Sequence, residues 1–330
     1  MPEIRRNPIT GESVIVAPGR AGRPHDFQPP PRAVRDRPAH RPDCPFCPGN
    51  EAATPVVTFS FPDDPWRVRA FPNKFSILSA TGDTWHRAEG LRVAGAAVGP
   101  QEVVVETRRH DLSLSRLPGD EVADVVRAWH ARFLAFHADP RVAFVSLFEN
   151  HGPSAGTSLE HPHAQIVGLP MVPAEFERRA AEAARHLAAE GACVVCRTLA
   201  DELSDGARVV HASPRFVAFV PWAALSPFHL WIFPRRHAGS FAVADAAELA
   251  ELGPHLGAVL GAVDRALGDP DYNLVVQSAP PAAAGSAALH WYVSVVPRVT
   301  TRAGFELGTA MYVNPSLPEE SAARLRAAAG

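Results

Sequence analysis

The sequence has no cysteine outside two short pairs, which argues against a disulfide-stabilised secreted scaffold. It has no run of about 18 uncharged apolar residues, so we expect no membrane-spanning helix. The first residues, Met1-Pro-Glu-Ile-Arg-Arg, lack the apolar core of a signal peptide. The formal net charge of −3 provides no electrostatic footprint for nucleic acid. Composition therefore predicts a cytoplasmic protein with neither nucleic-acid nor membrane partners.

Both cysteine pairs have the form Cys-x-x-Cys, and two distant histidines follow each pair. They make two sets of candidate metal ligands: Cys44, Cys47, His110 and His161 in the first, and Cys193, Cys196, His237 and His290 in the second. Two thiolates and two imidazoles suit a tetrahedral zinc ion, and four protein ligands leave no position for substrate. We expect two structural zinc ions per chain, with iron in one site left open. The alternative is that the cysteines are buried apolar residues or a redox dithiol.

The spacing of these ligands indicates an internal duplication. His161 follows His110 by 51 residues, and His290 follows His237 by 53 residues. His110 and His237 each end an Arg-Arg-His sequence that follows a β-rich apolar run. Such agreement in order and spacing is typical of a repeat. The intervals from cysteine to first histidine differ, so we infer that the halves diverged by loop insertion.

Periodicity predicts one long helix in each half, followed by two strands. The helices are expected at 119–137 and 245–267, with Asp120 capping the first, and the strands at 142–148, 161–167, 273–277 and 290–296. A segment rich in Ala, Glu and Arg predicts a connecting helix at 174–190. The Pro- and Arg-rich first forty residues predict an extended arm over the surface.

Strands joined by hairpins, with one long helix per half, favour an α+β fold over a parallel βαβ repeat. The duplication places the boundary in the middle of the chain. We expect an N-terminal domain at residues 1–172 and a C-terminal domain at residues 173–330.

His163 stands two residues after the candidate ligand His161, and Tyr292 takes its place in the second half. Residues i and i+2 of a strand share one face, so His161 can bind metal while His163 projects into a pocket. A neutral imidazole can accept a phosphoryl or nucleotidyl group and pass it on. The alternative is that His163 also serves the metal, but a doublet needed only for metal would be expected in both halves. We therefore predict that His163 is a catalytic nucleophile.

A loop with two glycines and several hydroxyl groups precedes this histidine. It runs from Asn150 through Gly156 to Ser158, and such a loop can present backbone N–H groups and hydroxyls to a phosphate. Gln165 can donate its side-chain amide to a phosphate oxygen. The second half has an Ala- and Pro-rich segment at 279–288 in place of this loop. The first half alone is therefore expected to be catalytic.

These motifs resemble those of the galactose-1-phosphate uridylyltransferase family, within the histidine-triad superfamily. The resemblance rests on His161-Pro-His163-Ala-Gln165, Phe148-Glu-Asn150, the Gly/Ser loop and Cys44-Pro-Phe-Cys47, and it extends nearly end to end. It implies tandem histidine-triad-type domains, a homodimer, and attack by His163 on the α-phosphorus of a nucleotide sugar. The residues it assigns to substrate are Arg20, Arg23, Asn73, Asn150, Gly156, Ser158 and Gln165. For Arg20 and Arg23, which would lie near the diphosphate, the alternative is solvated surface charge.

The activity that the resemblance implies is ping-pong transfer of a nucleoside monophosphate from a nucleotide sugar to a sugar 1-phosphate or phosphate. We expect uridylyl transfer between UDP-glucose and a hexose 1-phosphate. The second Cys-x-x-Cys pair is similar to that of two-zinc relatives, which include ADP-glucose phosphorylases, and segment 300–306 departs from the sugar-binding segment of galactose-specific enzymes. A zinc-stabilised nucleotide-binding protein without turnover is the third possibility, against which His163 and Gln165 argue.

Overall fold

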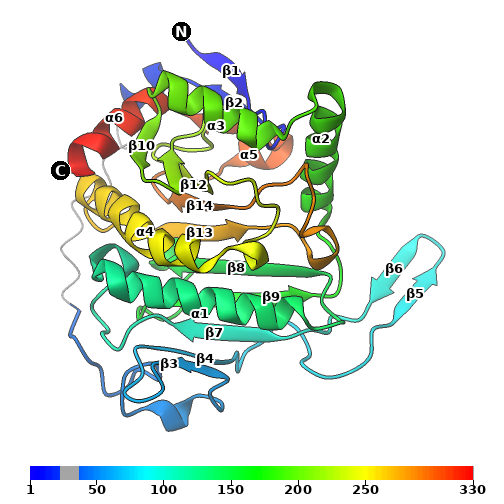
Figure 1. Cartoon of the computed structure of the whole chain (residues 1–330), viewed down its shortest axis with the longest axis vertical. Helices are drawn as coiled ribbons and strands as arrows, with labels where there is room; N and C mark the ends of the chain where they lie inside the picture. The colour runs from blue at the N-terminus through cyan, green and yellow to red at the C-terminus, as the bar shows by residue number, and fades with distance from the viewer. Residues whose placement is uncertain (23–36, 330) are drawn as a thin grey trace.

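One ten-stranded sheet runs through both halves of the chain (Figure 1). The computed structural model describes residues 1–22 and 37–329. From one edge to the other, the strands of this sheet are β10 (Val209–Ala212), β11 (Phe216–Phe219), β12 (Leu230–Pro234), β14 (Tyr292–Pro297), β13 (Tyr272–Gln277), β8 (Phe144–His151), β9 (His163–Leu169), β7 (Gln101–Val105), β4 (Val68–Pro72) and β3 (Phe59–Phe61). Together with its helices, this antiparallel sheet confirms the predicted α+β class.

The two halves correspond strand by strand around a central seam. Outward from the seam, the first half contributes β8, β9, β7, β4 and β3, and the second half contributes β13, β14, β12, β11 and β10. At the seam β8 and β13 pair antiparallel, with Asn150 opposite Asn273 and His151 opposite Tyr272. The duplication inferred from ligand spacing is therefore present in the order of the strands.

Two long helices cover one face of the sheet, α1 (Gly119–His137) from the first half and α4 (Ala246–Leu267) from the second (Figure 1). They pack directly on each other, and a Cβ atom at Gly253 of α4 would overlap the backbone of Ala123 in α1. Their apolar sides enclose the main core, which includes Trp129, Phe133 and Leu256. The two halves are therefore joined both by the β8–β13 pairing in the sheet and by this contact between helices.

The opposite face of the sheet carries the candidate metal ligands. Over the second half it is covered by α2 (Ala174–Glu190) and α3 (Val194–Asp205), which pack on Phe219, Trp231 and Phe233. Over the first half it is covered by the loop that holds Cys44, Phe46 and Cys47. The remaining elements lie at the margins: β5 (His86–Glu89) and β6 (Arg92–Gly95) form a projecting hairpin, and α5 (Gly304–Thr309) and α6 (Pro318–Ala329) follow near the C-terminus (Figure 1).

The helices and strands predicted from periodicity are all present, and α1 and α2 have the expected limits. Two details of the sequence-based prediction were wrong. Pro118, not Asp120, occupies the N-cap of α1, and Asp120 lies in the first turn, where its charge still favours the helix dipole. The N-terminal arm is not merely extended, because β1 (Glu3–Arg6) and β2 (Ser13–Val16) form a small sheet with β15 (Tyr312–Asn314). In the described part of the chain, no helix has the length and apolarity to cross a membrane.

Candidate active site and metal centres

Three separate segments of the first half bring the first set of candidate ligands together. Nδ1 of His161 lies 3.7 Å from Sγ of Cys44 and 3.5 Å from Sγ of Cys47. Nδ1 of His110 lies 3.6 Å from Sγ of Cys47, and all four ligand atoms lie within 4.8 Å of one another. A tetrahedral zinc ion with bonds of about 2.0–2.3 Å separates its ligand atoms by roughly 3.3–3.8 Å. These four side chains therefore fit such an ion.

Hydrogen bonding fixes which nitrogen of His161 faces the thiols. Nε2 lies 2.8 Å from the carbonyl oxygen of Thr107, the second residue after β7. A carbonyl oxygen can only accept, so Nε2 carries the proton and Nδ1 presents its lone pair to the thiols. Burial lowers the pKa of His161 to about 4, which keeps the ring neutral. A neutral imidazole anchored through its second nitrogen is the usual form of a metal-ligating histidine.

The second set repeats this arrangement. Nδ1 of His237 lies 3.4 Å from Sγ of Cys196, and Nδ1 of His290 lies 3.7 Å from the same sulfur. Nε2 of His290 donates to the carbonyl of Pro234 at 3.0 Å, as His161 does to Thr107. The two histidine rings of each set are 5.3 Å apart, at 80° in the first and 85° in the second. Both predicted ligand sets are therefore assembled, with nearly equal ring geometry.

Electrostatics at the thiols also fits a cation. Burial raises the pKa of Cys44, and it raises the pKa of Cys196 to about 11. Without a cation these thiols would remain protonated beside neutral imidazoles. The protein would then gain little stability from bringing the four side chains together. A bound divalent ion favours the thiolates and repays their desolvation. Each half therefore contains a Cys2His2 group that can hold a metal ion.

His163 is the first residue of β9 and pairs with Val105 of β7. Its ring lies on the sheet face away from α1, with its centroid 5.2 Å from that of Phe46. Nδ1 lies 2.8 Å from the carbonyl oxygen of His161, so Nδ1 carries the proton and Nε2 has the lone pair. Burial lowers the pKa of His163 below its usual range. The side chain therefore offers a neutral nitrogen nucleophile at Nε2.

The orientation of the Gln165 amide is set by two neighbouring amides. Its Oε1 accepts from Nδ2 of Asn73 at 3.2 Å and from Nε2 of Gln101 at 3.0 Å. These two amides are oriented in turn by backbone donors, because the N–H of Phe75 points at Oδ1 of Asn73 and the N–H of Ile77 at Oε1 of Gln101. Nε2 of Gln165 has no hydrogen-bond partner among the described residues. It is therefore a free donor.

The loop after β8 uses most of its backbone donors internally. The N–H of Ser154 donates to the carboxylate of Asp271 at 2.7 Å. Those of the next three residues donate to the carbonyls of Gly152 and Pro153. The expectation that the loop presents a row of backbone N–H groups to phosphate is therefore wrong for residues 154–157. Gly156 has φ +91° and is exposed, as is Ser158.

Side-chain donors remain available beside this loop. β8 pairs with β9 so that Phe148 lies opposite Gln165 and Glu149 opposite Ala164. Continuing the same register places Asn150 opposite His163, on the same face of the sheet. The structure thus gathers His163, Gln165 and Asn150 on neighbouring strands.

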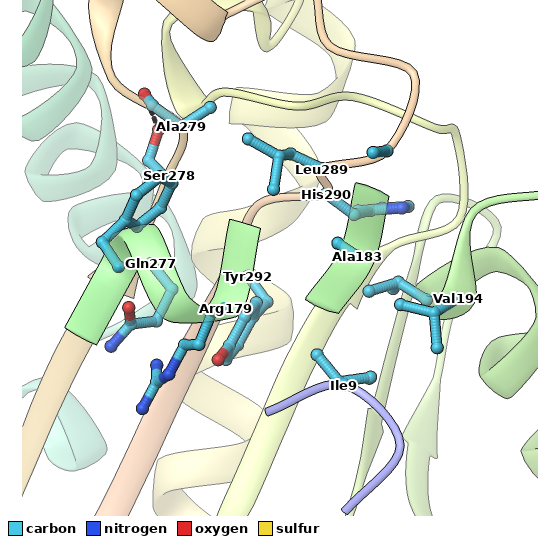
Figure 2. Close-up of a pocket in the computed structure, with 13 residues that line it drawn as sticks. Ile9, Arg179, Ala183, Val194, Gln277, Ser278, Ala279, Leu289, His290 and Tyr292 are labelled. Carbon is cyan, nitrogen blue, oxygen red and sulfur yellow. Dashed lines mark hydrogen bonds between the residues drawn. The ribbon is translucent and has the colours of Figure 1, made fainter. Parts of the chain in front are cut away.

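The corresponding place in the second half is a small pocket next to the second Cys2His2 group (Figure 2). Tyr292 stands there where the first half has His163, and its ring stacks on Phe233 with centroids 4.7 Å apart. Figure 2 shows Tyr292 with Arg179 beside it and Gln277 nearby. The pocket has a volume of about 50 Å³, room for only a few water molecules. In this structure the pocket is therefore much smaller than a nucleotide.

The structure describes only one of the two arginines that are predicted to lie near the diphosphate. Arg23 lies outside the described residues. Arg20 is exposed in a 3-10 turn after β2, and within the described chain no hydrogen bond joins its side chain to His163, Gln165 or Asn150. Its role remains a prediction. Sequence reasoning missed Gln101, Asp271 and Asn273, whose importance depends on strand register and leaves no local motif.

The chain is similar to known proteins along nearly its whole length. Residues 1–173 match the family described as galactose-1-phosphate uridyl transferase, N-terminal domain. The chain is 31% identical over 332 residues to ADP-glucose phosphorylase of Arabidopsis thaliana, covering 98% of this chain and 92% of the relative. It is 28% identical over 337 residues to galactose-1-phosphate uridylyltransferase of Thermotoga maritima, covering 99% and 98%.

Solved structures extend the similarity to three dimensions. The crystal structure of the Arabidopsis ADP-glucose phosphorylase with bound ADP-glucose superposes with a TM-score of 0.84 at 29% identity, covering 99% of this chain and 98% of that one. A uridylyltransferase structure superposes with a TM-score of 0.77 at 28% identity, covering 100% and 98%. The family match spans more than half of the sequence and these relatives span nearly all of it, so the chain belongs to the galactose-1-phosphate uridylyltransferase family.

Proposed function

We propose that this protein is a nucleotidyltransferase that moves a nucleoside monophosphate from a nucleotide sugar to an acceptor in two displacements, with His163 as the nucleophile. The observation that carries this proposal is the hydrogen bond from Nδ1 of His163 to the carbonyl of His161 at 2.8 Å. It leaves the lone pair of Nε2 on the open side of the ring. Tyr292 has no such nitrogen, so one active site per chain is expected.

In the first displacement Nε2 attacks the α-phosphorus of the nucleotide sugar. A P–N bond forms, the P–O bond to the β-phosphate breaks, and sugar 1-phosphate leaves with the bonding electron pair. In the second displacement an acceptor phosphate oxygen attacks the same phosphorus and the P–N bond breaks, which restores neutral His163. During both steps, Nδ1–H remains bound to the His161 carbonyl and holds the ring in place.

Three donors beside His163 are suited to the phosphates. They are the free amide groups of Gln165 and Asn150 on the neighbouring strand positions and, as the family resemblance implies, the hydroxyl of Ser158, which is exposed in the loop. Donors that are already oriented stabilise the charge that develops on the phosphate oxygens without reorganising at the moment of reaction. The family resemblance assigns Asn73 to the nucleoside, and in this structure its side chain also orients the Gln165 amide.

The first candidate reaction is uridylyl transfer between UDP-glucose and a hexose 1-phosphate, as in the uridylyltransferases that this chain resembles. The second is phosphorolysis or adenylyl transfer with ADP-glucose. One observation favours the second candidate: the relative named ADP-glucose phosphorylase, whose crystal structure contains ADP-glucose, has a higher identity and a higher TM-score than the uridylyltransferase. The nucleotide found on His163 decides between them.

Zinc is the metal that best suits both Cys2His2 groups, because their ligand atoms have tetrahedral spacing and all four positions are filled by protein. Both ions would be structural. The first would fix the backbone that carries His163. We further propose domains at residues 1–172 and 173–330, which the internal duplication indicates, a cytoplasmic location, which the composition indicates, and a homodimer, which the family resemblance implies.

The test is to incubate the protein separately with UDP-glucose and ADP-glucose without acceptor, and then to map any adduct by mass spectrometry. We expect an acid-labile, base-stable phosphoramidate on His163, whose mass identifies the nucleotide. His163→Asn should abolish adduct and turnover with normal metal content, whereas the matched variant Tyr292→Phe should keep both. Wild-type turnover in His163→Asn would falsify the mechanism, and a complete lack of turnover in the wild type would favour a nucleotide-binding role.

A further inference from the structure

The loop of the first-half site is held in place by residues of the second half. β8 and β13 meet at the seam, where Asn150 lies opposite Asn273. Asp271, two residues before Asn273, accepts the N–H of Ser154 at 2.7 Å. Gly152 packs so tightly against the Asp271 carboxylate that a Cβ atom there would overlap it. The loop is therefore held by Asp271, the residue just before β13, in addition to its internal hydrogen bonds.

Asn273 joins two parts of the site through one nitrogen. Its Nδ2 lies 2.9 Å from the carbonyl oxygen of Ala155 in the loop and 2.8 Å from Oδ1 of Asn150. The backbone carbonyl can only accept, so the atom that faces it must be the NH2 group. The second hydrogen of this group then points at Asn150, which must present its oxygen. The orientation of both amides thus follows from one backbone carbonyl.

This arrangement leaves the NH2 group of Asn150 directed away from Asn273. Within the described residues it has no hydrogen-bond partner. By register it lies on the strand beside His163, on the same face of the sheet. Hydrogen bonds from an oriented N–H group to an anionic oxygen are strong, whereas a carbonyl oxygen in the same place would repel the anion. The direction of this one amide therefore decides whether Asn150 attracts or repels a phosphate.

We propose that Asn273 is a positioning residue for nucleotidyl transfer, which orients the Asn150 amide so that its N–H donors face the phosphates of the nucleotide sugar. The inference rests on the function proposed above and adds a role for the second half of the chain. That half has lost the nucleophile, yet it supplies the group that directs a donor in the surviving site.

The first test replaces the donor by an acceptor of the same size, Asn273→Asp. The carboxylate would repel the Ala155 carbonyl and would attract the NH2 group of Asn150, so the Asn150 amide turns its oxygen to the substrate. We expect adduct formation on His163 from UDP-glucose or ADP-glucose to slow by about 100- to 1000-fold, as when one oriented donor is lost. The control is Asn314→Asp, whose amide donates to the Ala224 carbonyl at 3.0 Å in another part of the fold. Both variants can lose thermal stability, but only Asn273→Asp should lose adduct rate at a temperature where both are folded.

The second test asks whether Asn273 acts through Asn150. Asn273→Ala should slow adduct formation in the wild-type background, and should change it by less than about threefold when Asn150 is already alanine, because residues that act as one unit are not additive. Equal effects in both backgrounds overturn the proposal, as does a wild-type rate in Asn273→Asp. If Asn273→Asp does not fold, the alanine cycle decides alone. If the wild-type protein forms no adduct, both the proposed function and this inference are wrong. If the wild type is labelled normally and the Asn273 variants are labelled at the same rate, only this inference is wrong.

Discussion

Nδ1 of His163 donates to the backbone carbonyl of His161, so the candidate metal ligand and the proposed nucleophile lie two residues apart in the chain and have opposite tautomers. The proton on Nε2 of His161 frees Nδ1 for the metal. The proton on Nδ1 of His163 frees Nε2 for phosphorus. Whatever fixes the backbone at His161 therefore also fixes the direction of the His163 ring.

This relationship predicts that the two metal groups differ in their effect on catalysis. The double variant Cys193→Ser/Cys196→Ser should lower the zinc content from about two ions per chain to about one and lower the thermal midpoint, because metal-binding free energy is folding free energy. Adduct formation on His163 should persist at a permissive temperature. The matched double variant Cys44→Ser/Cys47→Ser should lose the other ion and the adduct together. Elemental analysis and adduct mass give the readouts, and full zinc content in either variant would show that its site is misassigned.

Gln101 is predicted to orient Gln165 although it is remote from the nucleophile in sequence. Gln101→Leu removes one of two donors to Oε1 of Gln165 and should slow adduct formation by roughly tenfold, the usual effect of losing a hydrogen bond to a group that binds charge. Gln101→Glu should be worse, because a carboxylate facing Oε1 favours the reversed Gln165 amide. The control is Gln277→Leu, which lines the pocket of the second half. Single-turnover rates that are equal for all three variants would contradict this role.

Gly152 is required by two independent features of the loop. Its φ of +84° is strained for other residues, and a Cβ atom would overlap the Asp271 carboxylate. Gly152→Ala should therefore cost about 2 kcal/mol or more of stability and displace the loop, slowing adduct formation. Gly285→Ala is a matched control in the corresponding segment of the second half, since a Cβ atom there meets nothing within 4 Å. Equal thermal midpoints for the two variants, measured by calorimetry, would argue against this account.

Buried His229 should make the fold sensitive to acid. Burial lowers its pKa from 6.5 to about 3, and the ring is held neutral by bonds from the Leu225 N–H and to the Ser294 hydroxyl. Between these pH values the unfolded chain binds a proton that the folded chain does not, so stability is lost as pH falls through this window. His229→Gln should reduce the slope of thermal midpoint against pH between 6.5 and 4, even if it lowers the midpoint at pH 8. His86→Gln, in the exposed hairpin, should leave the slope unchanged, and a wild-type slope in His229→Gln would exclude this explanation.

Much of this architecture could be predicted from the sequence because its signals are local. The apolar period of α1 and the Ala-rich composition of α2 lie within single segments, and the cysteine and histidine sets are explicit in residue type and order. The sheet of β1, β2 and β15 could not be found in this way, since β2 pairs with residues about 300 positions later. The N-cap prediction for α1 favoured Asp120 over Pro118 because a side-chain acceptor is the commoner cap.

The site could be predicted only as far as its motifs extend. His163, Gln165 and Asn150 belong to recognisable patterns, but the residues that orient them do not. Gln101 and Asn273 are ordinary strand residues whose effect arises from register across β7 to β9 and across β8 to β13. The composition of the loop at residues 150–158 predicts backbone donors that face phosphate, and only the three-dimensional hydrogen bonds show that those of residues 154–157 are occupied.

The pairing of β8 with β13 has a consequence for any attempt to divide the chain. A fragment that stops near residue 172 would leave the outer hydrogen-bonding edge of β8 bare, and such an edge is a ready template for another strand. A second copy of the same fragment can supply that strand around a two-fold axis. The expected product is a symmetric dimer with two copies of His163, in which Asn273 is missing and each loop has lost the aspartate on which it rests. Such a dimer would contain two histidine nucleophiles where the full chain has one, but its amide donors would be poorly oriented. It would serve as an experimental intermediate for asking how an asymmetric single-chain enzyme can arise from two equal halves.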